Sequence, residues 1–220
     1  MKKPGVYVIL LLAGVGAWAQ ESAGGPAADE ALTKLMAGNR RYVRHRQQHP
    51  DQSLARRKEL EKAQHPFAVI LGCADSRVSP ELLFDQGLGD LFVIRVAGNI
   101  ADDAVLGSIE YAVEHLGTKL IMVLGHEKCG AISAAVDGGV SAGHIQELVT
   151  AIRPSVEAAG KEAGDKIHNC VIANARRVAQ QVRESEPVLK ESVEKHGVKV
   201  VAADYALDSG KVNLLDPGRP

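Results

Sequence analysis

The 220-residue sequence carries 26 lysine and arginine residues against 27 aspartate and glutamate residues, a formal net charge of −1 at pH 7. Without a basic excess, neither nucleic acid nor an anionic membrane surface is an expected partner. The length suits one domain with a sizeable core, and three cysteines do not form the even set of four or more that is typical of a disulfide scaffold.

Residues 1–19 have the features of a secretory signal peptide. The positively charged MKK precedes the apolar run VYVILLLAGVGA, and Ala17 and Ala19 are small residues at the positions that signal peptidase reads. The uncharged stretch is short for a membrane-spanning helix of about 20 residues. We therefore expect cleavage before Gln20 and export to the periplasm or the exterior, without a stable membrane anchor.

The remainder divides into a short leader and one domain. Residues 20–29, rich in Ala, Gly and Pro, predict a flexible leader, and residues 30–220 predict a single domain. The domain opens with an amphipathic helix over residues 30–48, in which Gly38 marks a point where the helix could break. Residues 53–63 then predict a solvated helical or irregular segment.

Short apolar, β-branched runs alternate with helical patterns along the rest of the chain. This alternation predicts an α/β fold with a mostly parallel sheet flanked by helices. Ser79 and Pro80 predict a helix start, as N-cap and first helical residue. The final segment VNLL follows the turn LDSGK and predicts a closing hairpin. The predicted strands are 66–73, 90–97, 119–126 and 198–205, and the predicted later helices are 106–117, 143–160 and 170–195.

Three metal-ligating side chains follow two of these strands. Cys73 ends the first run, and His126 and Cys129 end the third. Because sites in parallel sheets form beyond the carboxyl ends of the strands, we expect the three residues to meet at one edge. Two thiolates and one imidazole can hold a catalytic zinc and leave one position open. A redox protein that bridges Cys73 and Cys129 is a weaker alternative, because it needs no histidine and the sequence has no C-x-x-C.

Asp75 and Arg77 add a pair that a structural zinc site does not need. Two residues apart in an extended segment, their side chains can lie on one side and form an ion pair. An ionised Asp75 can only accept hydrogen bonds. It would therefore orient a zinc-bound hydroxide, while Arg77 would hold the carboxylate away from the metal.

The motifs GCADSRVSPELLF, DLFVIRVAGNIADD, VLGSIEYAVEHLG and VLGHEKCGAI resemble those of the β-class carbonic anhydrases. The similarity runs from the helix that contains AGNRRY to the final hairpin and covers nearly all of the mature chain. The resemblance implies reversible hydration of carbon dioxide to bicarbonate and a proton by zinc-bound hydroxide, with one zinc per chain. It also implies a parallel sheet core, an N-terminal helical arm that wraps a partner subunit, and active sites at the interfaces of a homodimer or higher homo-oligomer.

Further site residues follow from the resemblance alone. Gln64 matches a glutamine that donates to substrate in the plant-like subgroup, and Phe92 and Tyr111 match aromatic positions near the pocket. The bicarbonate-inhibited subgroup has a tryptophan where this chain has Ile70, which implies that the regulatory site of that subgroup is missing. His65 is a conceivable proton shuttle, although a surface loop position explains it more simply.

Two alternatives stay open on the same fold. One is hydrolysis of carbon disulfide or carbonyl sulfide at the same zinc, and the other is a non-catalytic, zinc-stabilised interaction protein. The presence of Asp75 and Arg77 counts against the second. Cys170, at the start of a predicted helix, is expected to be a half-buried free thiol.

Overall fold

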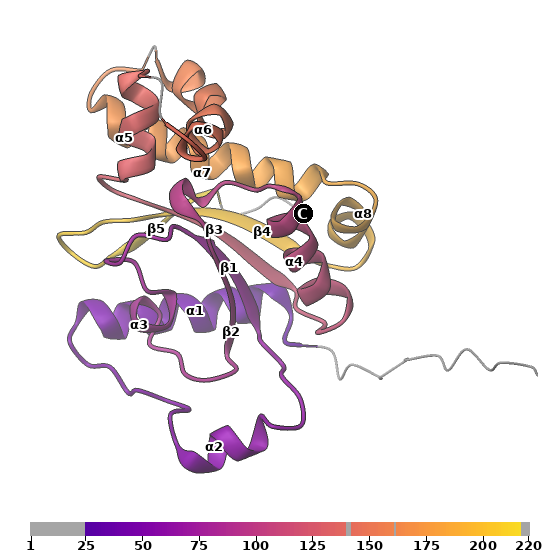
Figure 1. The fold of residues 1–220 in the computed structure, drawn as a ribbon. Coiled ribbons are helices and arrows are strands. Elements are labelled where there is room, and N and C mark those ends of the chain that lie inside the picture. Colours follow the sequence, from indigo (N-terminus) through magenta and orange to yellow (C-terminus); the bar gives the residue numbers. More distant parts are fainter. Residues whose placement is uncertain (1–24, 140–141, 161, 217–220) are drawn as a thin grey trace, which may run out of the picture.

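The computed structural model describes residues 25–139, 142–160 and 162–216, and within these ranges it forms a five-stranded sheet (Figure 1). The strand order is β2-β1-β3-β4-β5, with β1 to β4 parallel and β5 antiparallel to β4. This confirms the predicted α/β fold and its closing hairpin. The strands are β1 (Ala68–Gly72), β2 (Leu91–Arg95), β3 (Leu120–His126), β4 (Lys199–Tyr205) and β5 (Val212–Asp216).

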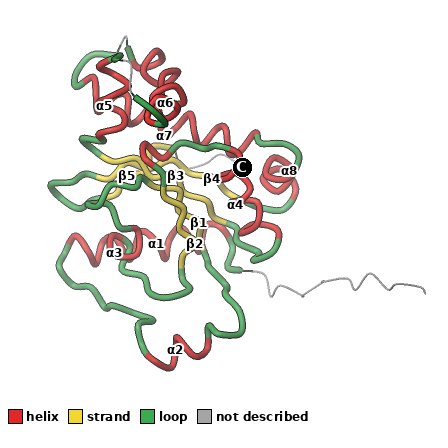
Figure 2. Tube along the Cα trace, in the orientation of Figure 1, coloured by secondary structure: helices red, strands yellow, loops and turns green. Residues whose placement is uncertain are grey.

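Helices cover both faces of the sheet (Figure 2). Helices α1 and α3 lie on one face, and α4, α7 and α8 lie on the other, whereas α5 and α6 stack beyond one end of the sheet. The helices are α1 (Ala28–Val43), α2 (Leu54–Glu59), α3 (Pro80–Leu83), the 3₁₀ turn η1 (Ala97–Asn99), α4 (Asp103–Glu114), α5 (Gly130–Asp137), α6 (Ile145–Ala159), α7 (Lys166–Glu184) and α8 (Val188–Lys195).

Alternation along β1 explains this layering. Val69 and Leu71 pack with α4 and α7, while Ala68 and Ile70 face the layer that contains α1 and α3. All four are fully buried, and each large aliphatic side chain contributes roughly 1.5–3 kcal/mol by leaving water. Because both faces are closed, polar chemistry is confined to the ends of the strands.

Helix α1 packs against the sheet of its own chain. Leu35 is fully buried in the cluster that contains Ile70 and Phe84. The predicted break at Gly38 does not occur, since the helix continues to Val43. A Cβ atom at residue 38 would lie 1.7 Å from the carbonyl oxygen of Phe84, so glycine serves close packing. Among the described residues of the N-terminal region, α2 projects from the sheet and has no buried residues (Figure 1).

The long helix predicted over residues 170–195 is two helices. Helix α7 begins at Lys166, where the Asp165 side chain accepts from the backbone N–H groups of Ile167 and His168, and it ends at Glu184. Pro187 lacks an N–H and restricts the residue before it, so the chain restarts as α8.

The predicted helix start is confirmed, with Ser79 at the N-cap position of α3. Pro80 is the first residue of α3, but the Ser79 side chain makes no capping bond, and its hydroxyl instead donates to Glu81 at 3.4 Å.

None of the helices in the described part of the chain is both long enough and apolar enough to span a membrane. The predicted signal peptide, residues 1–19, lies outside the described residues.

Candidate metal centre and active site

Two adjacent parallel strands bring the candidate ligands together. Cys73 directly follows β1, His126 is the last residue of β3, and Cys129 is the N-cap of α5. Leu71 pairs with Val123 and Gly72 with Leu124, which places both strand ends at one edge of the sheet. All three side chains are buried, and their ligating atoms lie within 4.8 Å of one another. The expected Cys/His/Cys cluster is therefore present.

The separation of the two sulfurs suits a single zinc ion. The Sγ atoms of Cys73 and Cys129 are 4.0 Å apart. Zinc–sulfur bonds of about 2.3 Å in a tetrahedral site would place two sulfurs about 3.8 Å apart. Both cysteines are free thiols, so the structure does not form the Cys73–Cys129 bridge that the redox alternative requires.

His126 presents a lone pair to these sulfurs. Its Nδ1 lies 2.9 Å from the backbone carbonyl oxygen of Glu127, which can only accept, so Nδ1 carries the proton. Its Nε2 is then an acceptor, and it is buried without a hydrogen-bond partner. An orphaned imidazole nitrogen beside two thiols is the arrangement that a metal ion satisfies, and the bond at Nδ1 fixes the ring orientation. The donor set therefore fits zinc.

The two thiols share hydrogen bonds that favour a thiolate at Cys73. Donation from Cys129 is the main effect that lowers the pKa of Cys73 to about 4, against the opposing effect of burial, and the Gly98 N–H adds to it. The neighbouring thiolate in turn raises the pKa of Cys129. The first-turn N–H groups of α5 at Ala131 and Ile132 oppose this rise, because a helix N-terminus favours negative charge. A divalent cation would be needed to deprotonate both.

Asp75 and Arg77 form the predicted ion pair. Arg77 donates from its backbone N and from Nε to Asp75 Oδ1, both at 2.9 Å, and from Nη2 to Oδ2 at 2.7 Å. These bonds hold the pKa of Asp75 well below its usual range. Oδ2 lies 3.9 Å from His126 Nε2, so the ionised carboxylate faces the ligand cluster.

Arg95 and Gly98 are site residues whose roles the sequence did not reveal. Arg95 donates from Nε to the carbonyl oxygen of Cys73 at 2.9 Å and from Nη2 to that of Asp75 at 2.6 Å, which fixes the loop between the two residues. Gly98 donates its N–H to Cys73 Sγ at 3.3 Å. Both belong to the R-x-A-G-N motif, so the signal was visible but carried no indication of its partners.

Gln64 does not reach this cluster within one chain. It is exposed and precedes β1, whereas Cys73 follows β1. At about 3.3 Å per residue, β1 alone separates the two ends by about 13 Å. His65 is likewise exposed at the amino end of the strand. Within one chain it is therefore not beside the candidate metal cluster, where a proton shuttle would have to lie.

Phe92 and Tyr111 lie close to each other, but not at the strand ends where the candidate ligands lie. Their ring centroids are 6.3 Å apart. Phe92 pairs with Val69, four residues before Cys73, and Tyr111 lies on α4 with 46 % of its surface exposed. The two rings form an aromatic pair beside β2, at the edge of the sheet, rather than a lining of the cluster in this chain.

Cys170 differs from its expected position. It is fully buried, not half-buried, and lies inside α7 rather than at its start. It packs in the same hydrophobic cluster as Cys73 and Cys129, but is not among the residues whose ligating atoms converge.

The family model described as carbonic anhydrase matches residues 68–212. Carbonic anhydrase 2 of Mycobacterium tuberculosis is 41 % identical over 190 residues, which cover 84 % of this chain and 92 % of that protein. A carbonic anhydrase of Mycolicibacterium smegmatis is 39 % identical over 188 residues, covering 84 % and 91 %.

Solved structures share the fold. A Coccomyxa β-carbonic anhydrase in complex with acetazolamide superposes with a TM-score of 0.66 at 27 % identity, covering 84 % of this chain and 86 % of that chain. A tetrameric β-carbonic anhydrase of Sordaria macrospora superposes with a TM-score of 0.69 at 22 % identity, covering 87 % and 97 %. Together with the Cys/His/Cys cluster and the adjacent ion pair, these matches show that the chain belongs to the β-class carbonic anhydrase family and is an enzyme of that class.

Proposed function

We propose that this carbonic anhydrase uses one zinc ion per chain, held by Cys73, His126 and Cys129, to interconvert carbon dioxide with bicarbonate and a proton. The observation that carries the proposal is the buried, unpartnered Nε2 of His126, which lies beside two free thiols and 3.9 Å from an ionised carboxylate. A zinc bound there would act as a Lewis acid that makes a water molecule nucleophilic near neutral pH.

The protein side chains supply orientation. The three hydrogen bonds from Arg77 occupy both oxygens of Asp75 and keep the carboxylate ionised, so that it acts as an acceptor only. Oδ2 receives one of these bonds and retains acceptor capacity on the side of the cluster. A hydroxyl group of the reacting species that donates to Oδ2 would then direct its lone pair away from Asp75.

Arg77 and Arg95 keep the carboxylate in that place. Arg77 also donates from Nη2 to the carbonyl oxygen of Lys128 at 3.3 Å, which links the loop after β1 to the segment between His126 and Cys129. Arg95 donates to the carbonyl oxygens of Cys73 and Asp75 and so holds the backbone of the same loop. The catalytic carboxylate is thus fixed relative to both strand ends that provide ligands.

The direct test combines metal analysis with stopped-flow carbon dioxide hydration. Wild type is expected to contain about one zinc per chain and to hydrate carbon dioxide, whereas Cys73→Ser should lose both, because serine is a poor zinc ligand at neutral pH. Cys170→Ala, which removes the buried thiol outside the cluster, should keep both. Carbon disulfide hydrolysis without carbon dioxide hydration, or full activity without metal, would contradict the proposal.

We also propose that the active enzyme is a homodimer or a higher homo-oligomer. Strand β2 ends the sheet, and its residues Leu91 to Ile94 are only half buried. Beside this edge lies the exposed ring of Tyr111. An apolar, unpaired edge favours pairing with a second copy of the chain. Gln64 of that second chain would then be available to complete the cluster of Cys73, His126 and Cys129. A monomer with full activity in analytical ultracentrifugation at assay concentration would contradict this.

Export is a further proposal, supported by the composition of residues 1–19. N-terminal sequencing of the protein recovered from its native cells should begin at Gln20. An intact N-terminus, with the protein retained in the cytoplasm, would overturn it.

A further inference from the structure

A hydrogen bond from η1 reaches the metal-ligating sulfur of Cys73. Gly98 donates its N–H to Sγ at 3.3 Å. The residue has φ +73°, and an added Cβ would lie 2.7 Å from the Ile152 side chain of α6, so this turn is held tightly against the helix. The direction of the N–H therefore depends on how the two peptide groups that flank the Gly98 Cα are fixed.

Asn174 fixes the peptide group on the carboxyl side of Gly98. Its Nδ2 donates to the carbonyl oxygen of Gly98 at 2.8 Å, and its Oδ1 accepts from the Ser155 hydroxyl at 3.0 Å. Only 1 % of Asn174 is exposed. A rotated amide would place oxygen against the carbonyl oxygen of Gly98, so the side chain has one favourable orientation.

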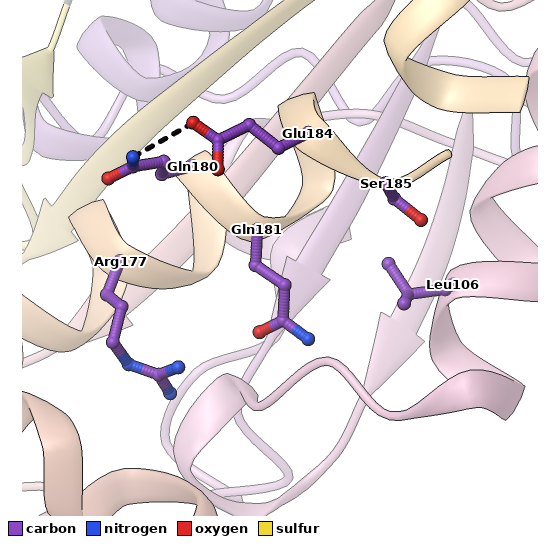
Figure 3. Close-up of a pocket in the computed structure, with 6 residues that line it drawn as sticks. All are labelled: Leu106, Arg177, Gln180, Gln181, Glu184 and Ser185. Carbon is purple, nitrogen blue, oxygen red and sulfur yellow. Dashed lines mark hydrogen bonds between the residues drawn. The ribbon is translucent and has the colours of Figure 1, made fainter. Parts of the chain in front are cut away.

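The network continues to the protein surface. Ser155 is fully buried on α6 and accepts from Arg177 Nε at 2.8 Å, while Arg177 Nη2 donates to the Ala151 carbonyl oxygen at 2.7 Å. Figure 3 shows the Arg177 side chain directed away from the bonded pair Gln180 and Glu184, and it lines a surface pocket of about 490 Å³. The donors Arg177, Ser155 and Asn174 thus form a continuous series that ends at the Gly98 turn.

We propose that Asn174 is a positioning residue for the zinc ligand Cys73, acting through Gly98. An N–H donor on a thiolate withdraws electron density from the sulfur, which otherwise passes to the metal. Asn174 makes no contact with the ligands, and its bond to Gly98 limits rotation of the turn that carries this donor. The inference rests on the proposed zinc function of Cys73.

The test compares Asn174→Asp with Gln181→Glu. The first change keeps the shape of the side chain but replaces the donor to Gly98 with an acceptor. Gln181 is a matched control on the same helix, because its Nε2 donates to the carbonyl oxygen of Ala101, three residues beyond Gly98 and without a bond to Cys73. Figure 3 shows both Gln181 and Arg177. The readouts are zinc affinity by chelator competition and the thiolate-to-metal charge-transfer band of the cobalt-substituted protein.

Asn174→Asp is expected to lower zinc affinity by about 10- to 100-fold, the usual effect of removing a group that orients a ligand. The charge-transfer band should move to longer wavelength, because the sulfur becomes more electron-rich. Gln181→Glu should change neither. If Asn174→Asp folds and has the wild-type band and affinity, the inference is overturned.

If Asn174→Asp does not fold, Ser155→Ala decides the question. It keeps the Asn174 side chain but removes the hydroxyl that holds Oδ1, so the amide is free to turn away from the carbonyl oxygen of Gly98. A smaller shift of the band in the same direction supports the inference, and an unchanged band overturns it. Failure of the proposed function gives a different result from failure of this inference, because wild type itself would then bind no zinc and show no hydration activity.

Discussion

Arg77 donates from Nε and Nη2 to the two carboxylate oxygens of Asp75, at 2.9 and 2.7 Å, and so forms a bidentate pair beside the candidate metal ligands. Half of the Arg77 side chain is exposed, whereas only 18 % of the Asp75 side chain is. The less solvated partner is therefore the one that faces the cluster. An exposed ion pair of this kind adds little stability, so its value lies in orientation.

Replacement of Asp75 by Asn is expected to keep zinc but to lower the hydration rate by a hundredfold or more, because an amide can donate as well as accept and no longer selects one orientation. The measurement is the carbon dioxide hydration rate with zinc quantified in the same samples. Asp103→Asn, at an exposed carboxylate in the first turn of α4, is the control and should retain the wild-type rate. A wild-type rate for Asp75→Asn would refute the orienting role.

Ile70 predicts a simple dependence of activity on pH. The side chain is fully buried in the core on the α1 side of the sheet, and it has no N–H with which to stabilise a bound bicarbonate. Hydration activity should therefore rise smoothly between about pH 6 and pH 9 as the catalytic water ionises. The measurement is kcat/KM against pH, with and without added bicarbonate. A cooperative loss of activity below pH 8 would show that a regulatory site exists despite the isoleucine.

The placement of the candidate metal ligands is predictable from the sequence because long apolar runs define strands, and the ends of parallel strands meet at one edge. Cys73, His126 and Cys129 needed no further information. The Asp75–Arg77 pair was predictable for a similar reason, since a spacing of two residues within one short segment limits where the side chains can point.

The features that were missed depend on contacts between distant segments. Gly38 resembles a helix break in the sequence because its partner, the carbonyl oxygen of Phe84, lies far along the chain, directly after α3. Asn174 meets Gly98 across 76 positions of sequence. Gln64 and Phe92 could not be placed at a site by one chain alone, because an edge strand does not identify what pairs with it. Local patterns predict elements, whereas these contacts arise only from packing.

Asp85 predicts a loss of stability in acid. Its side chain is 1 % exposed, and burial alone would raise its pKa. Hydrogen bonds from the backbone N–H groups of Gln48 and His49 and from the Arg41 side chain outweigh burial, so the pKa in the folded protein is lowered. The stabilisation is therefore present above the unfolded pKa of about 3.9 and is lost as the pH falls through the folded value.

Asp85→Asn is expected to lower the free energy of unfolding at pH 7 by roughly 2–4 kcal/mol, because it removes one acceptor oxygen and the charge that Arg41 faces. The difference from wild type should shrink below about pH 4. Urea unfolding at pH 7 and at pH 3 measures both effects, with Asp208→Asn at an exposed position as control. An equal loss at both pH values would show that the charge of Asp85 is not what stabilises this segment.

Two glycines within helices predict opposite effects of the same substitution. At Gly38 in α1, a new Cβ would lie 1.7 Å from the carbonyl oxygen of Phe84 and 2.9 Å from Gln86 Nε2, so α1 would have to move away from the segment that follows α3. At Gly107 in α4, nothing lies within 4 Å of a new Cβ, and the residue is exposed. Alanine there gains helix propensity without a steric penalty.

Gly38→Ala should therefore lower the free energy of unfolding by more than about 2 kcal/mol, in the range of overpacked cores, whereas Gly107→Ala should raise it by about 0.5–1 kcal/mol. Paired urea titrations of the two variants and wild type, with zinc saturating, measure the difference. Because neither glycine belongs to the candidate metal cluster, both variants should bind as much zinc as wild type. Stabilisation by Gly38→Ala would show that α1 does not pack as closely against Phe84 as this structure places it.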